Sequence, residues 1–235
     1  MADGIYVATA GAVARLHQLE VAANNLANAD TTGFRAQEVS FQEVLHDEFA
    51  APNRHMVAIG RTVSSVRPGS LQRTSHPMDL AFEGSGYFVV GPQNLLSRSL
   101  TLQVGPRGEL TDSFGRPVRG QSGPVHVDGL FPVRFGPRGE VIQQGTVVDQ
   151  LLTVSVPNES GLQPVGYGLL QASAESGMPV PTAARVVTGA LEGSNVNTLQ
   201  SMVQLIRLQR DYQSLSRAIN SYREADESLI ESAQR

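Results

Sequence analysis

Residues 205–229 read LIRLQRDYQSLSRAINSYREADESL, and the spacing of their apolar residues is the strongest indication of the fold. Its apolar residues recur at alternating intervals of three and four, the pattern of a helix that packs lengthwise against another helix. The repeat consists of Leu205, Leu208, Tyr212, Leu215, Ile219, Tyr222, Asp226 and Leu229, and only Asp226 breaks its apolar character. The sequence after Gly193 contains neither Gly nor Pro, so the helix should run unbroken, with Ser194 or Asn195 as its N-cap. Such a helix would be about 55–60 Å long, which is too long for a compact domain of this size to cover, so it needs a partner.

A second repeat of the same kind spans residues 5–26. Its members are Ile5, Thr9, Ala12, Leu16, Leu19, Ala23 and Leu26. The alanines allow a partner helix to approach closely, and the leucines supply most of the area to be buried. Two such helices at opposite ends of one chain are expected to pair, although each could instead cover a sheet in an ordinary α+β domain.

The first helix is expected to end near Asn28, because residues 24–34 read NNLANADTTGF. Asn, Asp and Thr side chains compete for backbone hydrogen bonds and favour caps and turns. Gly33 permits a positive φ, and Phe34 offers one large apolar anchor after the turn. A short amphipathic segment is expected next, at Val39, Phe41, Val44, Leu45 and Phe49, ending before Pro52.

From about Arg54 to Val187 the pattern changes to short β-like runs separated by Gly and Pro. Residues 78–90 read as a strand–turn–strand unit with Gly84-Ser85-Gly86 at the turn. The sequence GPRGE occurs at 105–109 and again at 136–140, each time between β-rich segments, so the same hairpin turn is expected twice.

The predicted fold is therefore α+β. The N- and C-terminal α-helices pair in a coiled-coil-like domain, and an antiparallel β-rich domain is inserted between them. The expected boundaries are residues 1–50 for the N-terminal part of the helical domain (helix about 3–28, then the Asn-rich turn), 51–190 for the β-rich domain, and 191–235 for the long C-terminal helix.

Composition excludes several classes of function. A formal net charge of −4 argues against a nucleic-acid-binding protein that relies on a basic surface. The absence of Cys excludes disulfides, thiolate metal sites and cysteine nucleophiles. Residues 1–14 lack the charged and apolar regions of a signal peptide, and no run of residues is apolar enough for a transmembrane helix. Composition alone would place the protein in the cytoplasm.

Candidate catalytic residues are sparse. The five histidines lack the spacing of a metal site, and neither a phosphate-binding loop nor a dinucleotide-binding motif occurs. A hydrolase using His76, Asp79 and Ser85 is one alternative, and a bound metal or a deep polar pocket would favour it. A soluble oligomeric adaptor, whose coiled coil presents a β-rich binding module, is another, and a closed dimer in solution would favour it. We expect a protein that is not an enzyme, with no cofactor, metal or small-molecule substrate.

Several segments resemble the bacterial flagellar basal-body rod and hook family. They are residues 4–8 (GIYVA), 23–28 (ANNLAN), 32–35 (TGFR) and 191–196 (LEGSNV), and residues 77–90 are similar to the rod–hook subgroup. The opening and the modest length most resemble the proximal rod members, with the distal rod members as near competitor. Residues 96–100 (LSRSL) keep the Arg of the family's Tyr-Thr-Arg-x-Gly stretch but lack its Gly.

The resemblance implies a structural subunit of the basal-body rod, of the proximal type, assembling through its terminal helices into a hollow helical shaft across the periplasm. It also implies export by the flagellar type III apparatus without a cleaved signal peptide, which replaces the cytoplasmic expectation. The implied partners are other rod proteins, proximal and distal, and copies of the chain itself. The surrounding ring is a further candidate partner, and nucleic acid is not expected.

The expected assembly interface combines both helical repeats with the Asn-rich segment. Apolar seams that exceed what one chain can bury supply such a contact, and a heterologous contact repeated by rotation and rise produces a helical tube. The expected interface residues are Ile5, Leu16, Leu19, Asn24, Asn25, Leu26, Asn28, Phe34, Leu205, Leu208, Tyr212, Leu215, Ile219 and Tyr222.

Overall fold

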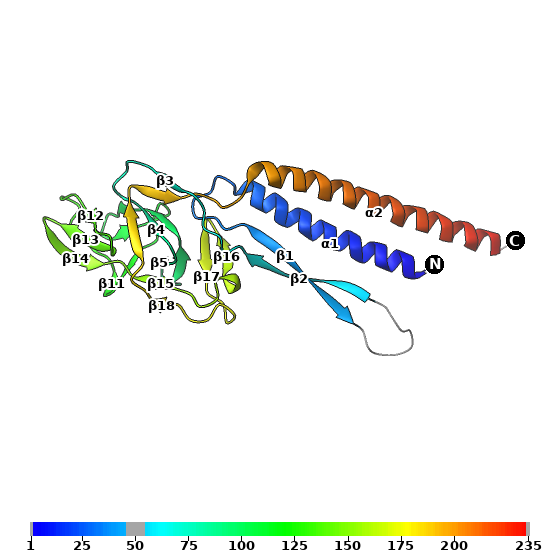
Figure 1. Cartoon of the computed structure of the whole chain (residues 1–235), viewed down its shortest axis with the longest axis horizontal. Helices are drawn as coiled ribbons and strands as arrows, with labels where there is room; N and C mark the ends of the chain where they lie inside the picture. Colours follow the sequence, from blue (N-terminus) through cyan, green and yellow to red (C-terminus); the bar gives the residue numbers. More distant parts are fainter. Residues whose placement is uncertain (1, 46–54, 234–235) are drawn as a thin grey trace. The chain divides into compact units, whose positions relative to one another are not determined.

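The computed structural model describes residues 2–45 and 55–233, which form two long helices and a series of short strands. Helix α1 spans Ala2–Ala27 and helix α2 spans Thr198–Ala233. The predicted architecture is confirmed: a helix at each end of the chain, in contact with each other, and many antiparallel strands between them in the sequence (Figure 1).

The chain divides into a helical unit and a β-rich unit. The helical unit contains α1, α2 and residues 37–63, and the β-rich unit contains residues 28–36 and 64–196. The boundaries expected at residues 50 and 190 divide the chain differently. In the structure the short segment after α1 belongs with the strands, and the strands that follow it belong with the helices.

In the helical unit α1 and α2 lie side by side and run in opposite directions (Figure 1). Gly11 lies against Leu215, since a Cβ placed on Gly11 would be 3.7 Å from the Cδ1 atom of Leu215. About one turn along, the Arg15 Nε atom is 3.8 Å from an oxygen of Asp211. In this register α2, with 36 residues against 26 in α1, extends beyond the N-terminal end of α1 (Figure 1).

The N-cap of α2 is Asn197, so the expectation of Ser194 or Asn195 is wrong. The Gln200 N–H donates to the Oδ1 atom of Asn197 at 3.0 Å, as an N-cap requires. Asn195 is occupied elsewhere: its Oδ1 accepts from the Ala36 N–H at 2.6 Å, and its Nδ2 donates to the Arg67 carbonyl at 2.7 Å. A side chain committed to those bonds cannot cap the helix.

Strands β1 (Gln37–Leu45) and β2 (His55–Ser64) pair with each other in the helical unit. The amphipathic segment expected here is therefore a strand as far as Leu45, and Phe49 and Pro52 lie outside the described residues. Alternating β-branched and aromatic residues favour the strand. The Asn25 side chain joins α1 to β1 by donating to the Gln37 carbonyl and accepting from the Gln37 N–H, both at 2.8 Å.

The β-rich unit is built from several antiparallel sheets. The largest sheet has the order β16 (Gln163–Gly166), β17 (Leu169–Gln171), β6 (Leu95–Ser97), β5 (Tyr87–Val90), β15 (Thr153–Ser155) and β18 (Val180–Pro181). Two smaller sheets have the orders β19 (Arg185–Thr188), β4 (Asp79–Glu83), β7 (Ser99–Thr101), and β12 (Arg134–Phe135), β13 (Glu140–Gln143), β14 (Thr146–Gln150). The remaining pairs are β3 (Leu71–Arg73) with β20 (Ala190–Glu192), β8 (Gln103–Val104) with β9 (Leu110–Thr111), and β10 (Arg119–Gly120) with β11 (Gly123–Pro124), and a short 3-10 helix spans Glu159–Gly161.

The predicted repeated hairpin turn is confirmed. The first GPRGE joins β8 to β9 and the second joins β12 to β13. The Gly105 N–H donates to the Glu109 carbonyl at 2.8 Å, and the Gly136 N–H donates to the Glu140 carbonyl at 2.9 Å. The same local sequence therefore closes the same turn twice.

Strands β4 and β5 flank Gly84-Ser85-Gly86 as predicted, but they belong to different sheets. Gly86 has a φ of 151°, and a Cβ there would lie 2.8 Å from the Cβ of Ala184. The turn thus leads the chain from one sheet to the next instead of closing a hairpin. The core packs across this change of sheet, with the rings of Phe82 and Phe88 4.1 Å apart.

Gly11 provides a test of the helix pair. Gly11→Ala should be accommodated, because the added methyl group would make only ordinary contact with Leu215, and it should stabilise α1 by up to about 1 kcal/mol because Ala is the better helix former. Gly11→Phe should overlap Leu215 and separate the helices. Thermal unfolding followed by circular dichroism at the helix band checks both variants, and equal tolerance of Ala and Phe would contradict the packing.

Candidate assembly surfaces and the buried cluster at Glu192

The interface residues expected on α2 lie mostly on the side that faces α1. Leu208 is buried, and Leu205, Tyr212, Leu215 and Ile219 are half-buried on the same helical face as the Leu215–Gly11 contact. Tyr222 is 40% exposed. The side chains of Asp226 and Leu229 lie outside the described part of the chain. This seam therefore already packs within one chain.

The interface residues expected near the N-terminus have mixed surroundings. Ile5, Leu19 and Leu26 are half-buried, and Leu16 is 41% exposed. In the Asn-rich segment Asn24 is exposed, Asn25 and Asn28 are half-buried, and Phe34 is buried. Asn25 and Phe34 thus act within the chain, whereas Leu16 and Asn24 remain on the surface.

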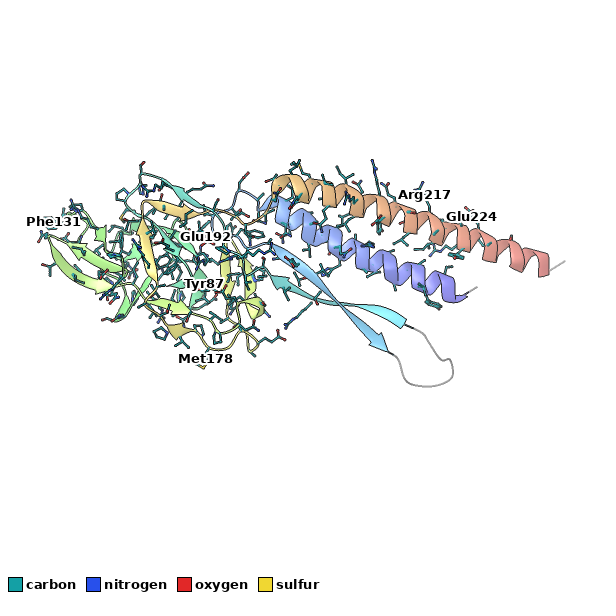
Figure 2. All side chains as sticks on the ribbon, viewed as in Figure 1. Tyr87, Phe131, Met178, Glu192, Arg217 and Glu224 are labelled. Atoms are coloured by element: carbon teal, nitrogen blue, oxygen red, sulfur yellow. The ribbon has the colours of Figure 1, made fainter. Side chains whose placement is uncertain are left out.

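Helix α2 has a second apolar face that the sequence analysis missed. It consists of Leu199, Met202, Val203 and Ile206, which are 73%, 46%, 43% and 49% exposed, and we name it the outer α2 patch. The spacing i, i+3, i+4, i+7 places these residues on one side of the helix, about 150° around the axis from Leu208 and Leu215. Farther along the same face lie the charged residues Arg217 and Glu224 (Figure 2). The apolar character is thus confined to the first turns of α2.

Helix α1 also exposes apolar side chains. They are Tyr6, Val7, Val13 and Leu16, with exposures of 69%, 69%, 51% and 41%, and we name them the outer α1 patch. In the antiparallel register set by Gly11 and Leu215, this patch lies toward the N-terminal end of α1. The outer α2 patch lies beside the last turns of α1. The two patches therefore lie at different levels along the helix pair.

The most heavily buried charges of the described residues meet at Glu192 in the β-rich unit (Figure 2). Glu192, Arg98 and Arg35 are 1%, 2% and 4% exposed. The Oε2 atom of Glu192 accepts from Arg98 Nε at 2.8 Å and lies 2.7 Å from Arg98 Nη2. Its Oε1 atom accepts from the Gly69 N–H at 3.0 Å and lies 3.4 Å from Arg35 Nη2. We name these three charged side chains the Glu192 cluster.

Arg98 is fixed by the Gly84-Ser85-Gly86 turn as well as by Glu192. Its Nη1 and Nη2 atoms donate to the carbonyls of Gly86 and Gly84 at 2.6 and 2.7 Å. Its guanidinium carbon lies 5.6 and 5.5 Å from the ring centroids of Phe82 and Tyr87, within range of a cation–π contact. These contacts give Arg98 a structural role in the β-rich unit.

Tyr87 presents a neutral ring to Arg98. Burial first, and the negative charge of Glu159 second, raise the pKa of the Tyr87 hydroxyl well above its ordinary value. The hydroxyl therefore stays protonated at neutral pH and hydrogen-bonds to the Glu159 side chain.

The arrangement of His76, Asp79 and Ser85 holds little that points to catalysis. The Nδ1 atom of His76 is 3.7 Å from Asp79, but Asp79 is buried and accepts from the Thr74 hydroxyl, and Ser85 lies in an exposed turn. Among the described residues, no group of three His, Asp or Glu side chains is placed to hold a metal ion. None of the described helices is long and apolar enough to span a bilayer.

Known proteins match the chain at both ends and over nearly its whole length. The family described as "Flagella basal body rod protein" matches residues 5–35, and "Flagellar basal body rod FlgEFG protein C-terminal" matches residues 187–232. FlgF of Salmonella typhimurium LT2 is 33% identical and FlgF of Escherichia coli K12 is 32% identical, each over 94% of both chains. FlgG of Agrobacterium fabrum is 29% identical over 92% of this chain and 93% of its own.

The two family matches fall on the parts of the chain described above. The first covers α1 and the segment through Arg35, and the second covers Glu192 and nearly all of α2. A relative one-third identical over 94% of both chains extends the likeness through the β-rich unit. The chain therefore belongs to the flagellar basal-body rod protein family, and it is a structural subunit of the rod, not an enzyme.

Proposed function

We propose that this chain is a proximal rod subunit of the FlgF type, which assembles through its terminal helices into a hollow helical shaft across the periplasm. The proximal assignment is supported by an identity of 33% to FlgF of Salmonella typhimurium LT2, compared with 29% to FlgG of Agrobacterium fabrum. The assembly mode is supported by one observation above the others: each terminal helix keeps an exposed apolar patch after the two helices have packed on each other.

Burial of these patches would drive association. Fully burying one exposed Leu, Ile, Val or Met side chain stabilises a contact by about 1.5–3 kcal/mol. The four residues of the outer α2 patch are 43–73% exposed, so each would contribute part of that amount. The outer α1 and α2 patches are different surfaces at different levels along the helix pair. A contact between the outer α2 patch of one subunit and the outer α1 patch of the next is heterologous, and it continues along a shaft when its rotation does not close into a ring.

The fourteen residues expected from the sequence have different roles in this proposal. Those on the α1–α2 seam would set the shape of the helix pair, and the exposed ones, such as Leu16 and Tyr222, would extend the contact with neighbours. The proposed partners are other rod proteins, copies of the chain and the surrounding ring, and the flagellar type III export apparatus during secretion.

Export without a cleaved signal peptide has a direct test. The protein recovered from purified basal bodies should still contain residues 5–14, and mass spectrometry of its peptides up to Arg15 detects them. Consistent loss of these residues from the assembled protein would show that a leader is removed, and that part of the proposal would be wrong.

The outer α2 patch provides the test of the assembly mode. Val203→Asp and Ile206→Asp should each reduce incorporation into basal bodies by more than about tenfold, because an unpaired carboxylate would be buried in an apolar contact. Quantitative immunoblotting of purified basal bodies measures incorporation, and circular dichroism checks that the variants keep their helices.

Gln204→Asp is the matched control. Gln204 is also exposed and adjacent to Val203, so the change adds the same charge at the same height of α2 but outside the patch. It should leave incorporation unchanged. Normal incorporation of the Val203 and Ile206 variants, or equal loss with the control, would rule out the patch as an assembly site.

A further inference from the structure

The Glu192 cluster joins the two segments that lead to the terminal helices. Residues 28–36 directly follow α1 and residues 193–196 precede α2, and both belong to the β-rich unit. We name these segments the helix roots. The Gly33 N–H donates to the Glu192 backbone carbonyl at 2.7 Å, and the Asn195 N–H donates to the Phe34 carbonyl at 3.3 Å. The roots are therefore bonded to each other and to the end of β20.

Close approach of backbone reinforces this junction. Gly69 accepts no side chain, because a Cβ there would lie 1.9 Å from the Gly193 carbonyl oxygen. The same loop supplies the Val66 and Arg67 carbonyls, to which Arg35 Nη1 donates, at 2.8 Å in the case of Val66. Arg35 thus links one helix root to the loop that packs against the other.

The two arginines of the cluster are held unequally. Arg98 donates to Glu192 and to the carbonyls of the Gly84-Ser85-Gly86 turn. Arg35 also donates to two carbonyls, those of Val66 and Arg67. It lies farther from the carboxylate, however, at 3.4 Å, and its buried Nε atom has no hydrogen-bond partner among the described residues. A buried donor without a partner is costly, so the cluster should open first at Arg35.

We propose that Arg35 and Glu192 form a latch that closes the helix roots onto the rest of the β-rich unit and that opens without unfolding the strands. When Arg35 leaves, Glu192 keeps Arg98 and the Gly69 N–H as partners. The pair that stays behind is electrically balanced, so no uncompensated charge remains buried. If Glu192 were lost instead, two buried cations would face each other. The latch is a property of the chain itself and does not depend on the assembly mode proposed above.

Hydrogen exchange of the full-length chain distinguishes a latch from a general contribution to stability. In Arg35→Ala, the Gly33 amide should exchange at least about tenfold faster, although its bond to the Glu192 carbonyl is not itself removed. The amides of Leu110 and Val118, bonded in the core to the Val125 and Leu110 carbonyls, should keep their exchange rates.

A second variant and a control complete the test. Asn195→Ala removes the hydrogen bonds that the root before α2 makes to Ala36 and Arg67. It should therefore also increase the exchange rate of the Gly33 amide. Arg185→Ala removes an exposed ion pair with Glu83 and should leave Gly33 unchanged. Three results would overturn the latch. They are an unchanged exchange rate of the Gly33 amide in Arg35→Ala, an equal increase in the exchange rates of the Leu110 and Val118 amides, and failure of the Arg35→Ala chain to fold.

Discussion

The antiparallel contact between α1 and α2 is the constraint on which the rest of the molecule depends. Gly11 allows Leu215 to approach closely. With the helices aligned at this contact, one apolar face of each helix is buried against the other. Because α2 has two apolar faces, only one of them can be satisfied within the chain. The outer α2 patch is what remains, and a subunit that must bind others along a shaft needs such a surface.

The β-rich unit holds the segments leading to these helices with buried charges, whereas apolar packing forms its core. The desolvation of buried ions offsets much of their attraction, so a cluster such as that at Glu192 contributes more to a defined arrangement than to stability. The cluster also gives the Gly84-Ser85-Gly86 turn a structural role, since two of its carbonyls accept from Arg98.

Signals carried by neighbouring residues were sufficient to predict the helices, the repeated GPRGE turn and the change to short strands. Contacts between distant residues were not predictable in this way. Asn195 does not cap α2 because its side chain accepts a hydrogen bond from the Ala36 N–H, 159 positions away. Likewise, the burial of Arg98 depends on its ion pair with Glu192, 94 positions away. The outer α2 patch did have a local signal in its spacing, but the longer repeat beginning at Leu205 overlaps it and is stronger.

If the exposed face of α2 becomes covered in the rod, a single thiol placed on that face can measure the change. The chain contains no Cys, so Ile206→Cys introduces a unique probe into the outer α2 patch. Its rate of maleimide labelling is compared between the isolated chain and purified basal bodies. Labelling should be at least about tenfold slower in basal bodies, with full reactivity restored by denaturant, as expected for a side chain buried at an interface. Equal labelling rates in the two samples would contradict burial of this face in the rod.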